Sequence, residues 1–150
     1  MRKDRGFSIV ELIVVMAVIG ILAALIIPRY TGFSSQAMDA RVISLLDSIR
    51  GAVSAYEARN GSFAGLPCGN SQSYWDPLVT ALAPYVALPS YSRLLEVARH
   101  VDGCQAYAEL ASEGYMVALW ANYPNSPMLA ATPLGVYRCT GFYTGCSRVR

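Results

Sequence analysis

Charged residues are scarce in this chain, and so are the residue types that most often build catalytic and metal sites. Only 15% of its 150 residues are charged, whereas about a quarter are in an ordinary soluble domain. There is one histidine, His100, and the four cysteines include no C-x-x-C pair, so no zinc ligand set of usual spacing is present. His100 lies near Asp102, but the members of a catalytic triad must meet in space, so we expect a surface histidine and predict no enzyme.

The net charge of +2 comes from the first six residues. There, Arg2, Lys3 and Arg5 outnumber Asp4. Subtracting these three bases from the twelve and this one acid from the ten leaves nine of each sign over residues 7–150. The balanced remainder provides no basic face that would predict nucleic-acid binding by bulk electrostatics.

Hydrophobic residues make up 54% of the chain, and the excess is concentrated in residues 7–27. As a helix these 21 residues would be about 31 Å long, which matches a hydrocarbon core of roughly 30 Å. Because basic residues precede the segment, we expect the leader to stay in the cytoplasm and the rest of the chain to cross the membrane.

Three interpretations of this segment were weighed. A cleavable secretory signal favours a shorter apolar core followed by a small-x-small site, and residues 23–25 form a poor one. A plain membrane anchor explains the length but not Glu11, because a carboxylate inside such a helix costs roughly 2.5–3.5 kcal/mol. The third interpretation gives Glu11 a function and a partner.

The residues RGFSIVEL at positions 5–12 carry a specific resemblance. They resemble the processing site of type IV prepilins and pseudopilins, in which a dedicated peptidase cuts after a glycine and N-methylates the new first residue. The resemblance implies cleavage after Gly6 and methylation of Phe7. Lysine is commoner in the family than Arg5, and Thr-Leu is commoner than the Ser-Ile at 8–9.

The resemblance also implies an assembly contact. Glu11 becomes the fifth residue of the mature chain, and the family pairs this acid with the amine of the first residue, Phe7, on a neighbouring subunit. An unpaired buried carboxylate is expensive, which gives that register a physical reason. The implied partners are further pilin subunits, the prepilin peptidase and methyltransferase, and an inner-membrane assembly platform. The implied location is the bacterial inner membrane and then a filament.

The apolar segment is followed by Pro28 and Gly32, which either end the helix or kink it. A continued helix is favoured by apolar residues spaced three and four apart, typical of one helix face. We therefore predict one long kinked helix from about residue 7 to 59, stopped by the Asn-Gly pair at 60–61. Asp47 and Arg50 stand three apart and can pair, and Asp39 and Arg41 are placed mostly off the apolar face. The apolar positions are Met38, Val42, Leu45, Ile49, Val53 and Tyr56.

The remaining residues predict a small globular head. Asp76 and Pro77 indicate a helix start, residues 93–100 a short helix, and residues 123–133 a loop. The strands are predicted at 105–110, 115–121 and 136–139. The expected fold class is α+β and pilin-like, with the long helix on a three- or four-stranded antiparallel sheet. The resulting division is a leader (1–6), a transmembrane or filament-core helix (7–28), an amphipathic helix (29–60) and a head (61–150).

An even number of cysteines in a non-cytoplasmic domain predicts two disulfides, with three possible connectivities. We favour Cys68–Cys104 and Cys139–Cys146, with free buried thiols as the alternative. Major pseudopilins often bind calcium near the C-terminal end of the chain, but no acid follows Glu113 here. A site using Asp102, Glu109 and Glu113 is therefore expected to be absent or altered, and no cofactor or metal is predicted.

Three functions follow from these patterns. The leading one is a structural subunit of a type IV pilus or related filament. The second is a pseudopilin of a type II secretion system, which would act as a protein export piston. The third is a membrane-tethered binding protein that never polymerises, and Glu11 with the Gly6–Phe7 junction argues against it.

Overall fold

A computed structural model describes residues 8–105 and 114–149, with the side chains of 25–33, 104 and 105 left out of the description. The chain divides into two compact units between Gln36 and Ala37. The first unit and the second unit are described separately.

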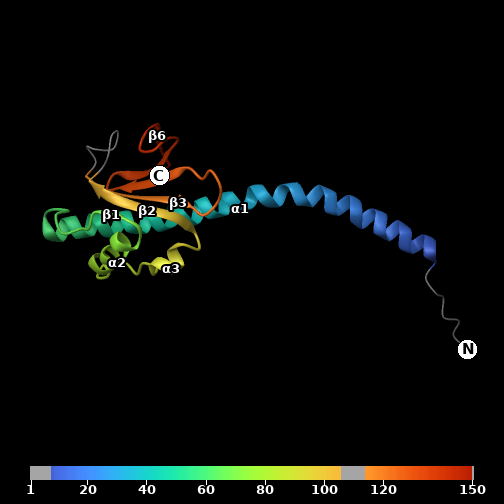
Figure 1. Ribbon diagram of the computed structural model, residues 1–150, viewed down its shortest axis with the longest axis horizontal. Coiled ribbons are helices and arrows are strands. Elements are labelled where there is room, and N and C mark those ends of the chain that lie inside the picture. The colour runs from blue at the N-terminus through green and yellow to red at the C-terminus, as the bar shows by residue number, and fades with distance from the viewer. Residues whose placement is uncertain (1–7, 106–113, 150) are drawn as a thin grey trace, which may run out of the picture. The chain divides into compact units, whose positions relative to one another are not determined.

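Helix α1 runs from Ile9 to Asn60, a length of 52 residues, and so belongs to both units (Figure 1). This agrees with the long helix expected from the sequence. It ends where the Asn-Gly pair was expected to stop it. The Asn60 side chain donates to the carbonyl of Tyr56 at 2.9 Å, and the Gly61 N–H donates to the carbonyl of Glu57 at 2.7 Å. Gly61 has a φ of 72°, the left-handed conformation that ends many helices at glycine.

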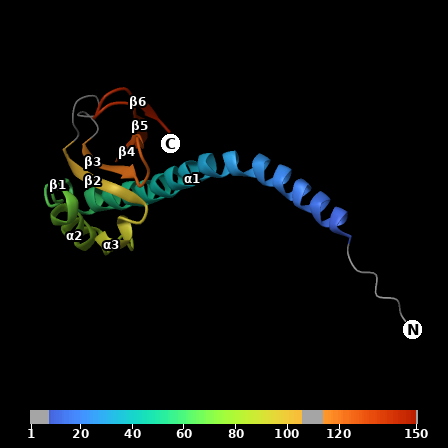
Figure 2. The same ribbon diagram turned by 45° about the vertical axis from the view of Figure 1, so that its right-hand side comes forward.

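The second unit contains one antiparallel sheet of six strands in the order β1-β2-β3-β4-β5-β6. Each strand therefore pairs with the next one along the chain. The second half of α1, with helices α2 and α3, lies on one side of the sheet, and the segment before β6 lies on the other (Figures 1 and 2). The head is thus α+β, as predicted. Its elements are β1 (Gly69–Asn70), α2 (Ser71–Leu82), α3 (Tyr91–Leu94), β2 (Ala98–Gln105), β3 (Tyr115–Ala121), β4 (Met128–Thr132), β5 (Gly135–Cys139) and β6 (Cys146–Arg148).

Strand β3 is buried along its whole length, because it is covered on both faces. Alternate residues of a strand point to opposite sides. Tyr115, Val117 and Leu119 belong to the core shared with α1 and α2, whereas Met116 and Trp120 belong to a second core on the opposite face. The sequence of β3 is accordingly an unbroken apolar run.

The buried stripe of α1 in the second unit follows the predicted face. Val42, Ile49 and Val53 are in the core, and Met38, Leu45 and Tyr56 are partly buried against it. Leu46 is also fully buried. The predicted pair within this helix is present, with Arg50 Nη2 at 3.2 Å from Asp47 Oδ1.

A tyrosine pair ties the start of the sheet to β3. The hydroxyls of Tyr74 and Tyr115 lie 3.0 Å apart, and Tyr115 donates to the carbonyl of Pro67 at 2.6 Å. Burial raises the pKa of both hydroxyls well above the usual value for tyrosine, so both stay protonated as donors. Polar groups buried at this point are therefore satisfied.

Several local predictions were wrong. Helix α2 begins at Ser71, not at residue 76, and contains Pro77, because burial of Tyr74 and Trp75 outweighs the backbone bond that proline removes. The second short helix is Tyr91–Leu94 only. Residues 98–100 belong to β2, whose pairing with β3 is a tertiary interaction that local pattern does not reveal. Likewise β4 lies inside the predicted loop 123–133, and residues 106–110 of the predicted first strand lie outside the described residues.

The buried side of β3 gives a test of the core. We expect Leu119→Ala to lower the free energy of unfolding by about 2–5 kcal/mol, because Leu119 is fully buried and its loss leaves a cavity. Chemical denaturation of the full chain in detergent would measure the change. The control Leu134→Ala removes a side chain that is 58% exposed and should change little; equal losses in both variants would contradict the packing described.

Candidate functional site

The first turn of α1 carries two hydrogen bonds between Ser8 and the residues that follow it. The Val10 N–H donates to Ser8 Oγ at 3.3 Å, and the Ser8 N–H donates to Glu11 Oε2 at 3.2 Å. This reciprocal arrangement is a capping box, which satisfies backbone donors that a helix start leaves without partners. The Glu11 carboxylate is exposed in the single chain. It also keeps acceptor capacity for a further donor, because a carboxylate has about four lone-pair sites.

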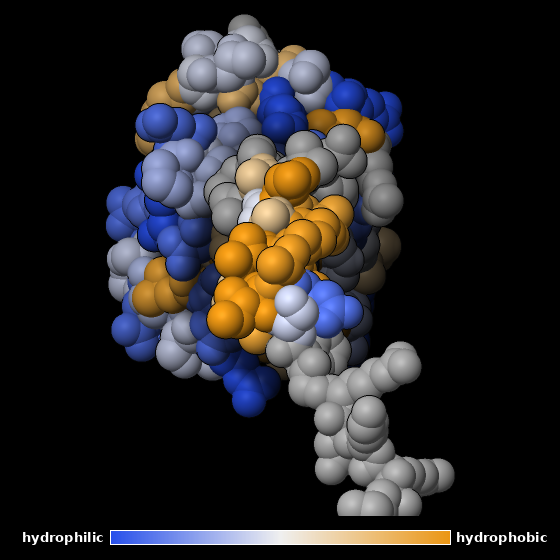
Figure 3. Space-filling view, turned by 90° about the vertical axis from the view of Figure 1, so that its right-hand side faces the viewer, coloured by the Kyte–Doolittle hydropathy of each residue, from blue (hydrophilic) through white to orange (hydrophobic). Residues whose placement is uncertain are grey.

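Beyond this turn, α1 presents apolar side chains on every side. Large hydrophobic residues from Ile9 to Leu22 are each at least half exposed, and they form the apolar band in Figure 3. An exposed apolar surface of this kind marks contact with a protein partner or a membrane. Within the part of the chain that the structure describes, no helix is apolar over enough residues to cross a membrane.

Some of the predicted site residues lie outside the description. Gly6 and Phe7, the predicted cleavage and methylation residues, are outside the described residues. Pro28 and Gly32 lie in the helical backbone of α1, but their side-chain surroundings are not described. The cleavage site, the assembly pair and the kink therefore stay predictions.

In the head, Asp39 connects α1 to the sheet. Its carboxylate accepts from the Tyr123 hydroxyl at 2.8 Å and from Arg138 Nη2 at 2.8 Å. Asp39 is only 7% exposed, so its placement off the buried face was wrong. Burial and the hydrogen bond to Asp39 raise the pKa of Tyr123, which keeps the hydroxyl protonated as a donor. The ion pair makes Asp39 compatible with burial.

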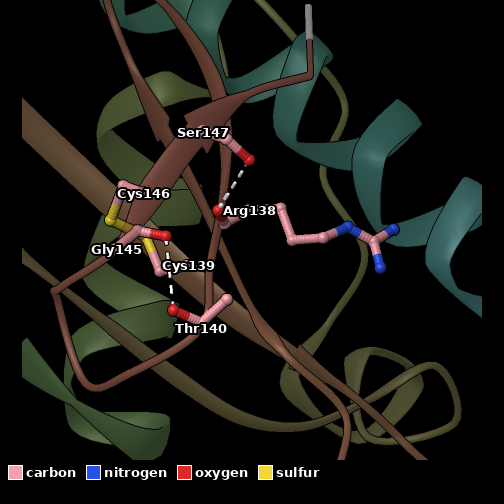
Figure 4. The surroundings of a disulfide bond; sticks show 6 residues. All are labelled: Arg138, Cys139, Thr140, Gly145, Cys146 and Ser147. Carbon is pink, nitrogen blue, oxygen red and sulfur yellow. Dashed lines mark hydrogen bonds between the residues drawn. A yellow bond between two sulfur atoms is a disulfide. The ribbon is translucent and has the colours of Figure 1, made fainter.

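Cys139 and Cys146 form a disulfide between β5 and β6, one of the two pairings favoured from the sequence. The bond closes a loop that the Thr140 N–H also ties, by donating to the Gly145 carbonyl at 3.3 Å. Figure 4 shows the bond beside Thr140 and Gly145, with the Arg138 side chain extending from the same strand toward α1.

Cys68 is also disulfide-bonded. The adjacent pairing of Gly69 with Gly103 places the backbone of residue 104 opposite that of residue 68. The side chain of Cys104 lies outside the description, so the Cys68–Cys104 pairing stays a prediction.

The remaining polar candidates do not assemble into a site. His100 and Asp102 are on β2, where His100 packs edge-on against Trp120 with ring centroids 5.0 Å apart, and Asp102 accepts a hydrogen bond from Tyr143. His100 is half-buried rather than the solvated surface residue expected. Among the described residues, no group of three or more acidic, histidine or cysteine side chains could hold a metal ion. Glu109 and Glu113 lie outside that description.

Two functional residues were missed from the sequence. Ser8 is identifiable afterwards from the S-x-x-E spacing with Glu11, the pattern of a capping box. The partners of Asp39 are not, because Arg138 is 99 positions away along the chain and no local pattern links them.

The fold and the first turn together define a class of protein: an α+β subunit whose N-terminal helix leaves its apolar surface uncovered within its own chain. The family model of the prokaryotic N-terminal methylation motif matches residues 1–27. Among relatives, the type II secretion system core protein G of Klebsiella pneumoniae is 33% identical over 63 residues, which is 42% of this chain and 45% of that protein.

A fimbrial protein of Neisseria meningitidis serogroup B is 34% identical over 62 residues, 41% of this chain and 36% of its own length. A core protein G from Klebsiella michiganensis is 29% identical over 94 residues, 63% of this chain and 66% of that protein. The chain thus spans less than half of the first two relatives. No solved structure matches it significantly. The chain belongs to the type IV pilin and pseudopilin family.

The capping box predicts a local effect of Ser8. We expect Ser8→Ala to destabilise the first turn of α1 by about 0.5–2 kcal/mol, because the Val10 N–H loses its acceptor. Amide hydrogen exchange at residues 9–11 of the full chain in detergent should become faster, and Ser8→Thr, which keeps a hydroxyl, should restore protection. Exchange unchanged in Ser8→Ala would contradict the cap.

The Asp39 contact predicts an effect on the head. We expect Asp39→Asn to lower the free energy of unfolding by about 1 kcal/mol or more, because Arg138 loses a charged acceptor. Denaturation of the full chain in detergent measures it, with Asp47→Asn as control, since an ion pair within one helix contributes a few tenths of a kcal/mol. A double-mutant cycle with Arg138→Met should give a coupling energy; additive losses would contradict a direct contact.

Proposed function

We propose that this chain is a structural subunit of a type IV pilus or related filament. It is processed by a prepilin peptidase and assembled through bundling of its N-terminal helix. The observation that carries the proposal is the exposed apolar surface of α1 with Glu11 at its start. Its position within the matched methylation motif adds support.

The exposed surface indicates why such a helix would bundle. Apolar area removed from water contributes roughly 25 cal/mol per Å², and within its own chain this part of α1 leaves its large apolar side chains uncovered. Packing against copies of the same helix would cover them. A bundle of this kind would also bury Glu11, and a buried carboxylate is strongly destabilising without a partner.

In this proposal, processing creates the partner of Glu11. Cleavage after Gly6 frees an amine on Phe7, which the same enzyme methylates, and a glycine before the scissile bond lets the backbone enter a narrow active site. The positive amine of one subunit then neutralises Glu11 of its neighbour. The Ser8 N–H already holds Oε2 of Glu11 at 3.2 Å, which leaves the other oxygen for the neighbour's amine.

The proposal also includes the location and the partners. The precursor resides in the bacterial inner membrane with its basic leader in the cytoplasm and its head outside, as the order of charges favours. An inner-membrane assembly platform then moves it into the filament. Disulfide bonds in the head are compatible with an oxidising compartment outside the cytoplasm.

A second function has specific support. Two of the relatives named above are core protein G of a type II secretion system, so a pseudopilin that drives protein export is the alternative. Both functions use the same helix and the same acid. Deletion of the gene in its host separates them, since loss of surface fibres indicates a pilin and loss of exported proteins indicates a pseudopilin.

We expect Glu11→Ala to leave cleavage intact and to abolish or strongly reduce filament assembly. The reason is that the variant removes the acceptor for the neighbour's amine while the residues around the scissile bond are unchanged. Mass spectrometry of the N-terminus measures processing and methylation, and electron microscopy of sheared fibres measures assembly in the host.

Glu96→Ala is the matched control, since it removes an exposed acid of the head and should assemble normally. Filaments of normal abundance from Glu11→Ala would overturn the assembly role of this acid. Native protein that retains Met1 and the basic leader would overturn the proposed function itself.

A further inference from the structure

Four side chains from three segments of the head line an open hollow on the sheet face opposite α1. The hollow has a volume of about 260 Å³ and is lined by Arg99, His100, Trp120 and Phe142. This is slightly below the range of roughly 300–1,000 Å³ typical of sites for drug-sized ligands. It therefore has room for a single ring with a substituent.

An irregularity in β2 brings two of these side chains together. Ala98 pairs with Ala121 and His100 pairs with Trp120, so Arg99 is an extra residue in the strand, a β-bulge. In a regular strand, residues 99 and 100 would point to opposite faces. Bulges re-aim side chains and are over-represented next to functional sites. Here both Arg99 and His100 line the same hollow.

The disulfide-closed loop places the fourth side chain. Tyr143 is turned into the second core, 6% exposed, and adopts a φ of 61°, a left-handed conformation that is uncommon outside glycine. The neighbouring Phe142 is 68% exposed and stacks on Trp120, with ring centroids 5.7 Å apart and planes 25° from parallel. The loop thus holds a large aromatic ring in solvent at the edge of the hollow.

The lining has a defined chemistry. Stacked aromatic faces accept other flat rings, and this contact is worth about 1–3 kcal/mol for a nucleobase. The guanidinium of Arg99 is exposed and offers donors in a fork that suits phosphate or carboxylate. Asp102, the acid on the same strand, is engaged by the Tyr143 hydroxyl and is absent from the described lining. A flat ring with an anionic group complements both parts of the site.

We propose that this hollow binds a nucleotide unit, with the base stacked on Phe142 and Trp120 and the phosphate held by Arg99. The unit comes either from a free nucleotide or from an unpaired single strand. Such a site needs no basic face, because stacking supplies most of the attraction. The inference does not depend on polymerisation of the chain.

Calorimetric titration of the full chain in detergent micelles tests the proposal, with adenosine monophosphate, adenosine and a short single-stranded oligodeoxynucleotide as probes. We expect the monophosphate to bind and to quench Trp120 fluorescence, while the fully buried Trp75 gives a constant background. Phe142→Ala should weaken binding about 5- to 150-fold through lost stacking. Arg99→Gln should weaken the monophosphate but leave adenosine unchanged.

Two variants away from the hollow serve as matched controls. Leu134→Ala removes another exposed apolar side chain, and Arg93→Gln removes another exposed arginine. Both should bind as the unchanged chain does. Binding of the monophosphate alone identifies a free nucleotide as the source, and much tighter binding of the oligonucleotide identifies a strand. No binding of either probe, or binding that Phe142→Ala leaves intact, would overturn the proposal.

Discussion

An apolar helix that leaves its side chains uncovered within its own chain must be covered by something else, and this constraint governs the first unit. Large hydrophobic side chains of α1 from Ile9 to Leu22 are exposed, and one carboxylate, Glu11, stands at the start of the series. Such a surface is unfavourable in water. A helix of this kind suits a subunit that passes from one apolar environment to another, as a filament subunit of this family does.

The head solves the opposite problem, since it buries both faces of its central strand. Helices α1 and α2 cover one face of β3, and the disulfide-closed loop covers the other through Tyr143. Asp39 joins the helix to β5 by an ion pair with Arg138. The helix thereby has two roles along its length, with its second half completing the core of the head. The same disulfide loop that closes the second core also holds Phe142 in solvent, so stability and the proposed site share one element.

How far the fold could be predicted depended on the range of the interactions involved. The long helix, its stop at residues 60–61 and the strand 115–121 carry local signals of period, breaker and β-propensity, and these elements are present. Strand β4 and the start of α2 were missed, because pairing with distant strands and burial of Tyr74 and Trp75 overrode the loop and proline signals. A six-stranded sheet built by successive pairing needs contacts that no window of sequence contains.

The sequence by itself determined the class of the protein, because the cleavage motif, the apolar segment and Glu11 lie within a dozen or so neighbouring positions and act through local chemistry. It also indicated the Cys139–Cys146 bond, whose partners are close along the chain. Only the tertiary structure decided that Asp39 is buried against Arg138 and Tyr123. It also brought Arg99, Trp120 and Phe142 around one hollow. These contacts join residues far apart along the chain, and folding of the sheet onto the helix is what places them together.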